Sequence, residues 1–344
     1  MSALITGCCY KVPEKYAQLP LDFDPNLQYE FGELINDPKS PFHPKKNDSK
    51  IMRKDEIASV IALREMFKKL NLCEQAMKDI DLYVANGVFL EDSNKYLTKI
   101  SNNFKDNPSM ANNPMEAIYK YTPPLLALET LTNSTMSLIA QYLKIAGYNA
   151  TFGNTSTSGF YALEEAFLNI SQSRSKMAIA GGSNCGGLYS LLMFRNFFEN
   201  APNWKESAAC AYLLIEKEGC RDESRTPLAN ITAMYSSTEI SFFNTTKKTL
   251  NIARFLDENQ VNSHIIFTGA LTSNLNEKLV NQLNKNHSIT NLYNYYGNSG
   301  VSGIYLGVIE AIKSFKNNDY SQLSVIDIDP YGRFSGINLE HVEH

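Results

Sequence analysis

Hydroxyl side chains crowd one short turn in the middle of the chain, Asn154-Thr-Ser-Thr-Ser-Gly159. A serine hydroxyl can act as a nucleophile, but it is almost wholly protonated near neutral pH and needs an adjacent base. Gly159 carries no side chain, so it leaves an approaching ligand room close to the backbone. This hydroxyl-rich turn (residues 154–159) is therefore the first stretch in which to look for a reactive site.

The residues after the turn build the elements that would position it. Leu163, Ala166, Phe167 and Ile170 recur at helical spacing, which predicts a helix with one buried face. The chain then reaches Lys176-Met-Ala-Ile-Ala-Gly-Gly182, a short apolar strand that ends in a glycine pair. The sequence thus predicts that the turn opens a buried helix and that a buried strand follows it.

The composition of the 344 residues is that of an ordinary globular protein, with 43% hydrophobic and 20% charged residues. A net charge of −4 gives no hint of a nucleic-acid surface. The sequence contains no run of about 18 apolar residues, so it predicts no transmembrane helix. The first residues, Met1 to Gly7, lack the basic and apolar regions of a signal peptide. We therefore expect a cytoplasmic protein.

Residues that commonly bind metals are scattered along the chain. The six cysteines have neither zinc-site spacing nor the pattern of a disulfide framework, so we expect reduced thiols. Four histidines, His43, His287, His341 and His344, also lack metal-ligand spacing. The glycine pairs after residue 180 are not followed by the Gly-Lys-Ser/Thr of a phosphate loop. We expect no bound metal or cofactor.

Strand and helix patterns run through the chain in two similar series. The first series has strands over Ser2–Gly7, Asp79–Ala85 and Cys210–Glu216, a helix over Met52–Leu70, and a helix from Asn133 to Gly147. The second has strands over Leu228–Tyr235, His264–Phe267, Ser324–Ile328 and Phe334–Leu339, with helices over Leu250–Leu256, over Leu275–Leu283 and after Gly300. These patterns predict an α/β fold with two halves, residues 1–225 and 226–344.

The order of these elements resembles that of the ketosynthases of the thiolase superfamily over nearly the whole chain. The motifs that carry the resemblance are Thr6-Gly7, the hydroxyl-rich turn with Ala180-Gly-Gly182, Tyr296-Gly-Asn-Ser-Gly300 and Tyr331-Gly-Arg-Phe-Ser-Gly336. The resemblance implies a duplicated five-layer αβαβα sandwich. It also implies that the turn is a nucleophile elbow, where the family places a cysteine that is acylated by a thioester.

The residues that occupy the family's catalytic positions are not the usual ones. Counted back from Ala162, the family's cysteine falls on Ser156, or on Thr157 if the turn is one residue shorter. The first histidine falls at Thr268, and the second polar position falls on Asn298, which suits a Cys-His-Asn branch of the family. Because the cysteine and the first histidine are both missing, the resemblance implies a chain that cannot condense by itself.

Two further sets of residues follow from the resemblance. An acyl tunnel would be lined by Ser156, Gly159, Phe160, Phe194 and Asn298. For Phe194, an ordinary core position is the commoner interpretation. His264 lies near the missing histidine in sequence, but not at its position, and is the first alternative for that role.

Three functions remain open at this stage. The first is a silent subunit similar to the chain-length factors of type II polyketide or fatty-acid-like systems, which would pair with an active ketosynthase and meet the phosphopantetheine thioesters of acyl carrier protein. The second is an acyltransferase or priming enzyme that uses Ser156, which requires a histidine or carboxylate within hydrogen-bond reach. The third is an acyl-ligand-binding or scaffold protein without synthase chemistry.

The resemblance also suggests where a partner would bind. The superfamily dimerises near the elbow, so we expect Met177 and Ile179 at the interface. Met177-Ala-Ile-Ala180 would then form an unpaired apolar sheet edge, which invites association. A heterodimer with an active ketosynthase and a homodimer would both satisfy such an edge.

Overall fold

A computed structural model describes residues 3–12, 17–18, 42–87, 93–108, 115–116, 120, 131–153, 155–185, 205–238, 252, 254–256, 264–268, 281, 283, 287–317, 320–329 and 333–342. Its main element is a ten-stranded mixed sheet in the order β10-β9-β11-β12-β8-β1-β7-β5-β3-β4. The strands are β1 (Ala3–Lys11), β3 (Asp81–Asn86), β4 (Asn149–Gly153), β5 (Met177–Asn184), β7 (Ala209–Lys217), β8 (Ala229–Thr238), β9 (His264–Phe267), β10 (Ser288–Asn291), β11 (Gln322–Ile328) and β12 (Arg333–Glu340). Two short strands, β2 (Ala17–Gln18) and β6 (Lys205–Glu206), pair separately.

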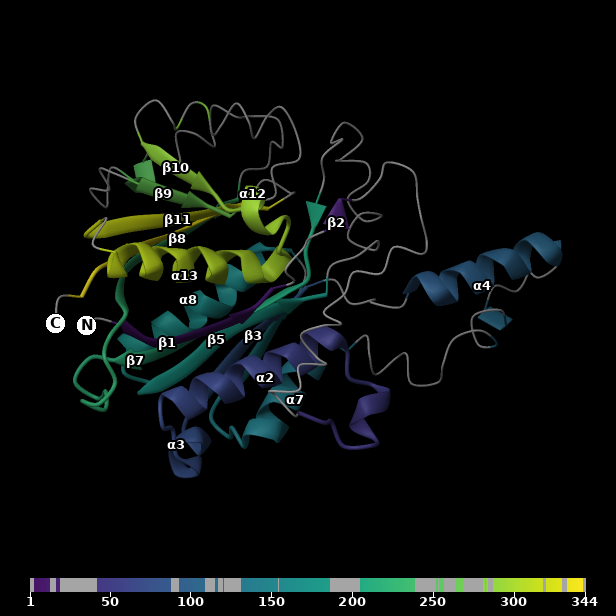
Figure 1. The fold of residues 1–344 in the computed structure, drawn as a ribbon, viewed down its shortest axis with the longest axis horizontal. Coiled ribbons are helices and arrows are strands. Elements are labelled where there is room, and N and C mark those ends of the chain that lie inside the picture. The colour runs from purple at the N-terminus through teal and green to yellow at the C-terminus, as the bar shows by residue number, and fades with distance from the viewer. Residues whose placement is uncertain are drawn as a thin grey trace.

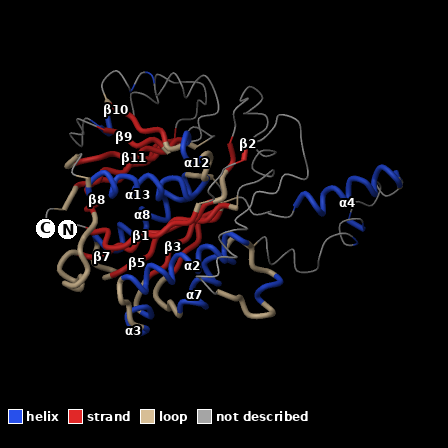
Figure 2. Tube along the Cα trace, in the orientation of Figure 1, coloured by secondary structure: helices blue, strands red, loops and turns tan. Residues whose placement is uncertain are grey.

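Helices account for most of the remaining described residues (Figure 2). The α-helices are α2 (Lys54–Lys69), α3 (Glu74–Lys78), α4 (Ser93–Asp106), α7 (Ser134–Leu143), α8 (Thr157–Ser171), α12 (Tyr293–Tyr296) and α13 (Gly303–Lys316). Two short 3₁₀ helices are η1 (Asp48–Lys50) and η3 (Gly300–Ser302). Among the described helices, none has the length and apolar character needed to cross a membrane.

The strand order repeats itself on either side of the β8–β1 pair. From the β4 end the order is β4-β3-β5-β7-β1, with two parallel pairings followed by two antiparallel ones. From the β10 end the order β10-β9-β11-β12-β8 has the same series of pairings. This repetition confirms the predicted duplicated α/β architecture. The boundary between residues 225 and 226 stays a prediction.

The helices and the two halves of the sheet are stacked in layers (Figure 1). Helices α8 and α13 run between the two halves of the sheet and build the central core with both. Helices α2 and α7 cover the other face of the N-terminal strands. On the outer face of the C-terminal strands, Ile252, Phe255 and Leu256 pack against residues of β9 and β11. The predicted αβαβα sandwich is therefore confirmed.

The two inner helices approach each other at a glycine, and this contact fixes the position of the hydroxyl-rich turn. A Cβ atom on Gly159 of α8 would lie 2.1 Å from the backbone oxygen of Val301, which precedes α13. The Tyr305 hydroxyl on α13 donates a hydrogen bond of 2.8 Å to the Gly159 backbone oxygen. Gly159 is therefore needed for close helix packing, because any side chain would collide with backbone.

Two expectations from the sequence are wrong. Strand β5 has hydrogen-bonded neighbours on both sides, β3 and β7, so Met177 to Ala180 do not form a free edge. Ile179 is completely buried within the chain's own core, and Met177 is half-buried. Helix α7 ends at Lys144 in the left-handed conformation (φ 58°), not at Gly147. Gly147 instead allows a close approach, because a Cβ there would lie 2.3 Å from the Ile80 backbone oxygen.

Two strands of the ten-stranded sheet were not anticipated, and they lie at its two ends. Strand β4 directly precedes the hydroxyl-rich turn and pairs only with β3 among the described strands. Strand β10 pairs only with β9. Both are short and partly exposed, with few apolar residues, which explains why hydrophobic patterning did not reveal them.

Candidate functional site

Three hydroxyl groups at the start of α8 point at two carboxylates on the C-terminal half of the chain. Ser156 Oγ donates a hydrogen bond of 2.7 Å to Asp327 Oδ2. Thr155 Oγ1 and Thr157 Oγ1 donate to Asp329 Oδ2 at 2.7 and 2.8 Å. Asp327 lies on β11, and Asp329 follows it. The start of α8 is thus tied to the carboxyl end of a strand in the other half of the sheet.

Asp327 also receives a hydrogen bond from the second candidate position. Thr268 Oγ1 donates to Asp327 Oδ1 at 3.1 Å, and the Thr268 backbone N–H donates to the Ile326 backbone oxygen at 2.9 Å. These bonds hold the end of β9 against β11. Ser156 and Thr268, which the resemblance predicts at the cysteine and first-histidine positions, therefore share one carboxylate.

The electrostatics of this cluster are set by the burial of Asp327. The side chain is 1% exposed, and this burial raises the pKa of Asp327 to about 6. The neighbouring Asp329 acts in the same direction, while the Ser156 and Thr268 hydroxyls oppose it. Asp329 forms an ion pair with Arg333 at 3.1 Å. From about pH 7 upward, Asp327 is therefore mostly ionised and places negative charge between Ser156 and Thr268.

Asn298, the third candidate position, stabilises the turn in which it lies. Asn298 Oδ1 accepts a hydrogen bond of 3.2 Å from the Gly300 backbone N–H, and the Asn298 backbone oxygen accepts one of 3.0 Å from the Ser207 N–H. Phe160 is completely buried in the central core. Phe194 lies outside the described residues. The tunnel assigned to these residues stays a prediction.

His264 is not the base of this cluster. It begins β9, whereas Thr268 follows the end of that strand, so about 13 Å of extended chain separates the two residues. The His264 ring instead contacts Ser288 Oγ at 2.6 Å and Thr290 Oγ1 at 3.0 Å, both on β10. Within the described residues, no three His, Cys, Asp or Glu side chains are grouped so that they could hold a metal ion.

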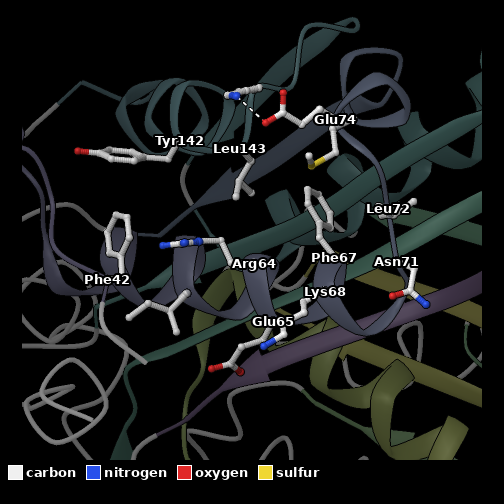
Figure 3. A pocket seen from close by; sticks show the side chains of 13 residues that line it. Phe42, Arg64, Glu65, Phe67, Lys68, Asn71, Leu72, Glu74, Tyr142 and Leu143 are labelled. Atoms are coloured by element: carbon white, nitrogen blue, oxygen red, sulfur yellow. Dashed lines mark hydrogen bonds and ion pairs between the residues drawn. The ribbon is translucent and has the colours of Figure 1, made fainter. Parts of the chain in front are cut away.

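A groove of about 740 Å³ lies elsewhere, on the outer side of α2, α3 and α7 (Figure 3). Phe42 and Tyr142 form one end as an edge-to-face pair with ring centroids 5.0 Å apart. The other end carries the exposed ion pair between Glu74 and Lys144, at 2.6 Å. Helix α2 packs on the face of the sheet opposite to α8, so this groove does not open onto Ser156.

The two aspartates were the part of the site that sequence reasoning missed. Asp327 was assigned to the strand Ser324–Ile328 without a chemical role, and Asp329 was not assigned to any element. The available signal was that acidic residues interrupt an otherwise apolar, buried strand, because a carboxylate is seldom fully buried without a specific partner.

Comparison with known proteins agrees with this fold. Residues 44–199 match the family model described as beta-ketoacyl synthase, N-terminal domain. Within these residues the chain is similar to the beta-ketoacyl synthases, and its fold is the thiolase-like fold of the ketosynthases. No curated protein sequence matches it.

Solved structures match the chain over 99% or more of its length at low identity. The ishigamide ketosynthase/chain length factor has a TM-score of 0.72, with 14% identity and 100% of both chains covered. A beta-ketoacyl synthase from Burkholderia phymatum STM815 has a TM-score of 0.71, with 13% identity over 99% of this chain and 100% of that one. The complex AntDE:AntF, a type II polyketide synthase acyl-carrier protein with its ketosynthase bound to the hexaketide, has a TM-score of 0.69, with 14% identity over 99% of each chain.

Proposed function

We propose that this chain is a ketosynthase-like subunit that does not condense acyl groups itself and that pairs with an active ketosynthase. The observation that carries the proposal is the Asp327 carboxylate, which accepts hydrogen bonds from both Ser156 and Thr268. Ketosynthase chemistry develops negative charge on a thiolate and on an enolate oxygen, and donors must stabilise it. A buried carboxylate at the same place opposes that charge.

The structural neighbours support a role beside an active enzyme. One is a ketosynthase/chain length factor, and another is a ketosynthase in complex with its acyl-carrier protein. By analogy, this chain would shape the acyl tunnel of its partner and meet carrier-protein thioesters through the complex. Because β5 is an interior strand, we place the partner along β4, the strand that precedes the hydroxyl-rich turn and lies at the end of the described sheet.

A second function is favoured by the same 2.7 Å contact. In an acyltransferase, the Ser156 proton would pass from Oγ to Asp327 Oδ2 while Oγ attacks the thioester carbonyl. The bond between the carbonyl carbon and sulfur would then break, and the thiolate would leave. A carboxylate within hydrogen-bond reach is the feature that this function requires. Against it stands the burial of Ser156, which is 9% exposed.

Intact-mass spectrometry separates the two functions. The purified chain is incubated with acyl- and malonyl-carrier-protein thioesters, alone and with an active ketosynthase that co-purifies with it. We expect no acyl adduct and no loss of carbon dioxide with the chain alone. An acyl mass that disappears in both Ser156→Ala and Asp327→Asn would establish the acyltransferase instead. A chain that never associates with a ketosynthase on size exclusion would contradict the partner role.

The double replacement Ser156→Cys with Asp327→Asn tests the electrostatic argument directly. In Ser156→Cys alone, the nearby carboxylate should raise the thiol pKa and slow alkylation by iodoacetamide at pH 7.5. Adding Asp327→Asn should accelerate alkylation of the same thiol at least tenfold, since one pKa unit changes the thiolate fraction about tenfold. Equal rates in the two variants would show that Asp327 does not control this position.

A further inference from the structure

A second serine lies against a possible base at the opposite end of β9. Ser288 opens β10, and its Oγ lies 2.6 Å from His264 Nδ1. The two residues face each other directly in the parallel pairing of β9 with β10, so their side chains project from the same face of the sheet. The two strands lie side by side at one end of the sheet (Figure 1). This contact is a hydroxyl–imidazole pair, whereas Ser156 contacts a carboxylate.

The rest of the environment holds the His264 ring in one orientation. His264 Nε2 lies 3.0 Å from Thr290 Oγ1, so an Nε2–H donated to Thr290 leaves Nδ1 as the acceptor for the Ser288 hydroxyl. The Tyr320 ring stacks on the imidazole, with centroids 4.7 Å apart and planes 15° apart. The tautomer with its proton on Nε2, which Thr290 Oγ1 can accept, is the one that leaves Nδ1 as a general base for Ser288, and the stacked Tyr320 ring holds the imidazole plane.

Burial of the two partners differs in the way that a nucleophilic site requires. His264 is 9% exposed, while Ser288 is exposed to solvent. Burial lowers the pKa of His264 below its ordinary value of 6.5, so the imidazole is neutral at pH 7 and able to accept a proton. The base is thus shielded, and the hydroxyl that it would activate is accessible.

We propose that Ser288 and His264 form a second nucleophilic site that hydrolyses small uncharged esters, with Thr290 as a positioning residue. Ser288 Oγ forms a bond to the ester carbonyl carbon as its proton moves to His264 Nδ1. The bond from that carbon to the leaving oxygen breaks, and the leaving group takes the proton from His264. Water then hydrolyses the acyl-serine by the same proton route, which restores the Ser288 hydroxyl.

The position on the sheet also suggests how the negative charge on the ester oxygen would be met. Strand β10 is the last strand of the described sheet, so alternate backbone N–H groups along its outer side point away from β9. Such groups can donate hydrogen bonds to an oxyanion. Ser288 is exposed at this strand, so a small ester can reach its hydroxyl.

The test is covalent labelling of the full-length chain with a fluorophosphonate probe, followed by peptide mapping. In this reaction the Ser288 Oγ–phosphorus bond forms, fluoride leaves, and His264 takes the proton. We expect an adduct on Ser288 that is lost in Ser288→Ala and slowed at least 100-fold in His264→Gln. Thr290→Val should slow labelling about tenfold, and Thr290→Ser, which keeps the hydroxyl, should restore it. Hydrolysis of p-nitrophenyl acetate should follow the same order.

The control is Ser224→Ala. Ser224 is an exposed serine whose hydroxyl donates to a carboxylate, Asp222, at 2.7 Å, so it resembles Ser288 in exposure but lacks an imidazole. Ser224→Ala should leave the labelling rate unchanged. The proposal is overturned if Ser288 is unlabelled, if His264→Gln labels at the wild-type rate while its circular dichroism is unchanged, or if the adduct maps to Ser156. The last result would instead support the acyltransferase function, so the two proposals fail separately.

Discussion

Helices α8 and α13 occupy equivalent places in the two halves of the duplicated fold, yet their first turns are held in different ways. Ser156, before α8, donates its hydroxyl to the Asp327 side chain on β11. Ser302, before α13, donates its hydroxyl to the backbone oxygens of Gly182 on β5 and Ala209 on β7, at 3.0 and 2.9 Å. One helix start is bound to an ionisable group, and the other to neutral backbone.

This difference separates the parts of the fold that serve structure from those that can serve chemistry. A backbone carbonyl keeps its charge state at every pH, so the start of α13 is a fixed packing contact. The Asp327 carboxylate can gain or lose a proton. Its charge state determines whether another negative charge can form beside Ser156. A duplicated fold thus keeps one helix start for packing and leaves the other free to vary in function.

The largest effect should come from the glycine that lets the two helices touch. Gly159→Ala should lower the free energy of unfolding by about 3 kcal/mol, because its Cβ would lie 2.1 Å from the Val301 backbone oxygen and backbone must move. Gly303→Ala, at the start of α13, is the matched control. Its nearest neighbour is 3.5 Å away, so it should be neutral or stabilise the chain by up to about 1 kcal/mol.

Urea unfolding of both glycine variants measures this difference. A similar loss of unfolding free energy in Gly159→Ala and Gly303→Ala would mean that both helix starts tolerate a Cβ equally well. The two starts would then not differ in packing.

The second effect concerns the pH dependence of stability. Asp327 keeps its proton up to about pH 6 in the folded chain, whereas the unfolded chain loses it near the ordinary value of 3.8. Between these pH values the folded state binds more protons, so the free energy of unfolding falls as pH rises. Asp327→Asn removes this pH-dependent contribution to the free energy of unfolding. Its stability relative to the wild type should therefore increase by up to about 3 kcal/mol between pH 4 and pH 7.

The measurement is urea unfolding at a series of pH values, with Asp222→Asn as a surface control. The pKa of Asp222 is lowered by hydrogen bonds from Ser224, so its small contribution has the opposite sign and is lost as pH falls. Parallel stability curves for the wild type and Asp327→Asn would show that the carboxylate titrates normally.

The smallest effect compares single hydroxyls at the two helix starts. Thr157→Val removes a donor to the buried Asp329 carboxylate and should cost about 2 kcal/mol, since hydrogen bonds to charged groups are the stronger class. Ser302→Ala removes a donor to neutral carbonyls and should cost about 1 kcal/mol. Denaturant midpoints give both values, and a larger loss for Ser302→Ala would reverse the proposed order.

Hydrophobic periodicity was enough to predict the long buried elements but not the short exposed ones. Strand β9 was predicted at its observed residues, His264 to Phe267, because all four are buried. Strands β4 and β10 have few apolar residues, so nothing in their pattern marked them. The interior position of β5 was also hidden, because an apolar strand looks the same at an edge and between two neighbours.

The site shows a second limit. The resemblance to ketosynthases predicted Ser156 and Thr268 at two of the family's catalytic positions. The fold brings both side chains to one carboxylate. The carboxylate itself could not be found by spacing, because Asp327 lies 171 positions from Ser156 and no local pattern links residues so far apart. Only the pairing of β11 with β9, and the packing of α8 between the sheet halves, creates the contact.

That long separation has a consequence for the history of the protein. Under the proposed function, condensing chemistry would need a thiol at position 156, a histidine at position 268 and the loss of the carboxylate at position 327, and no one of these changes alone provides a reactive site. A cysteine beside Asp327 is held protonated, and a serine freed from Asp327 has no base. Single substitutions on either route therefore bring no benefit on which selection could act. Under the proposed function, a chain with this pair of residues therefore gains condensing activity only when several substitutions occur together.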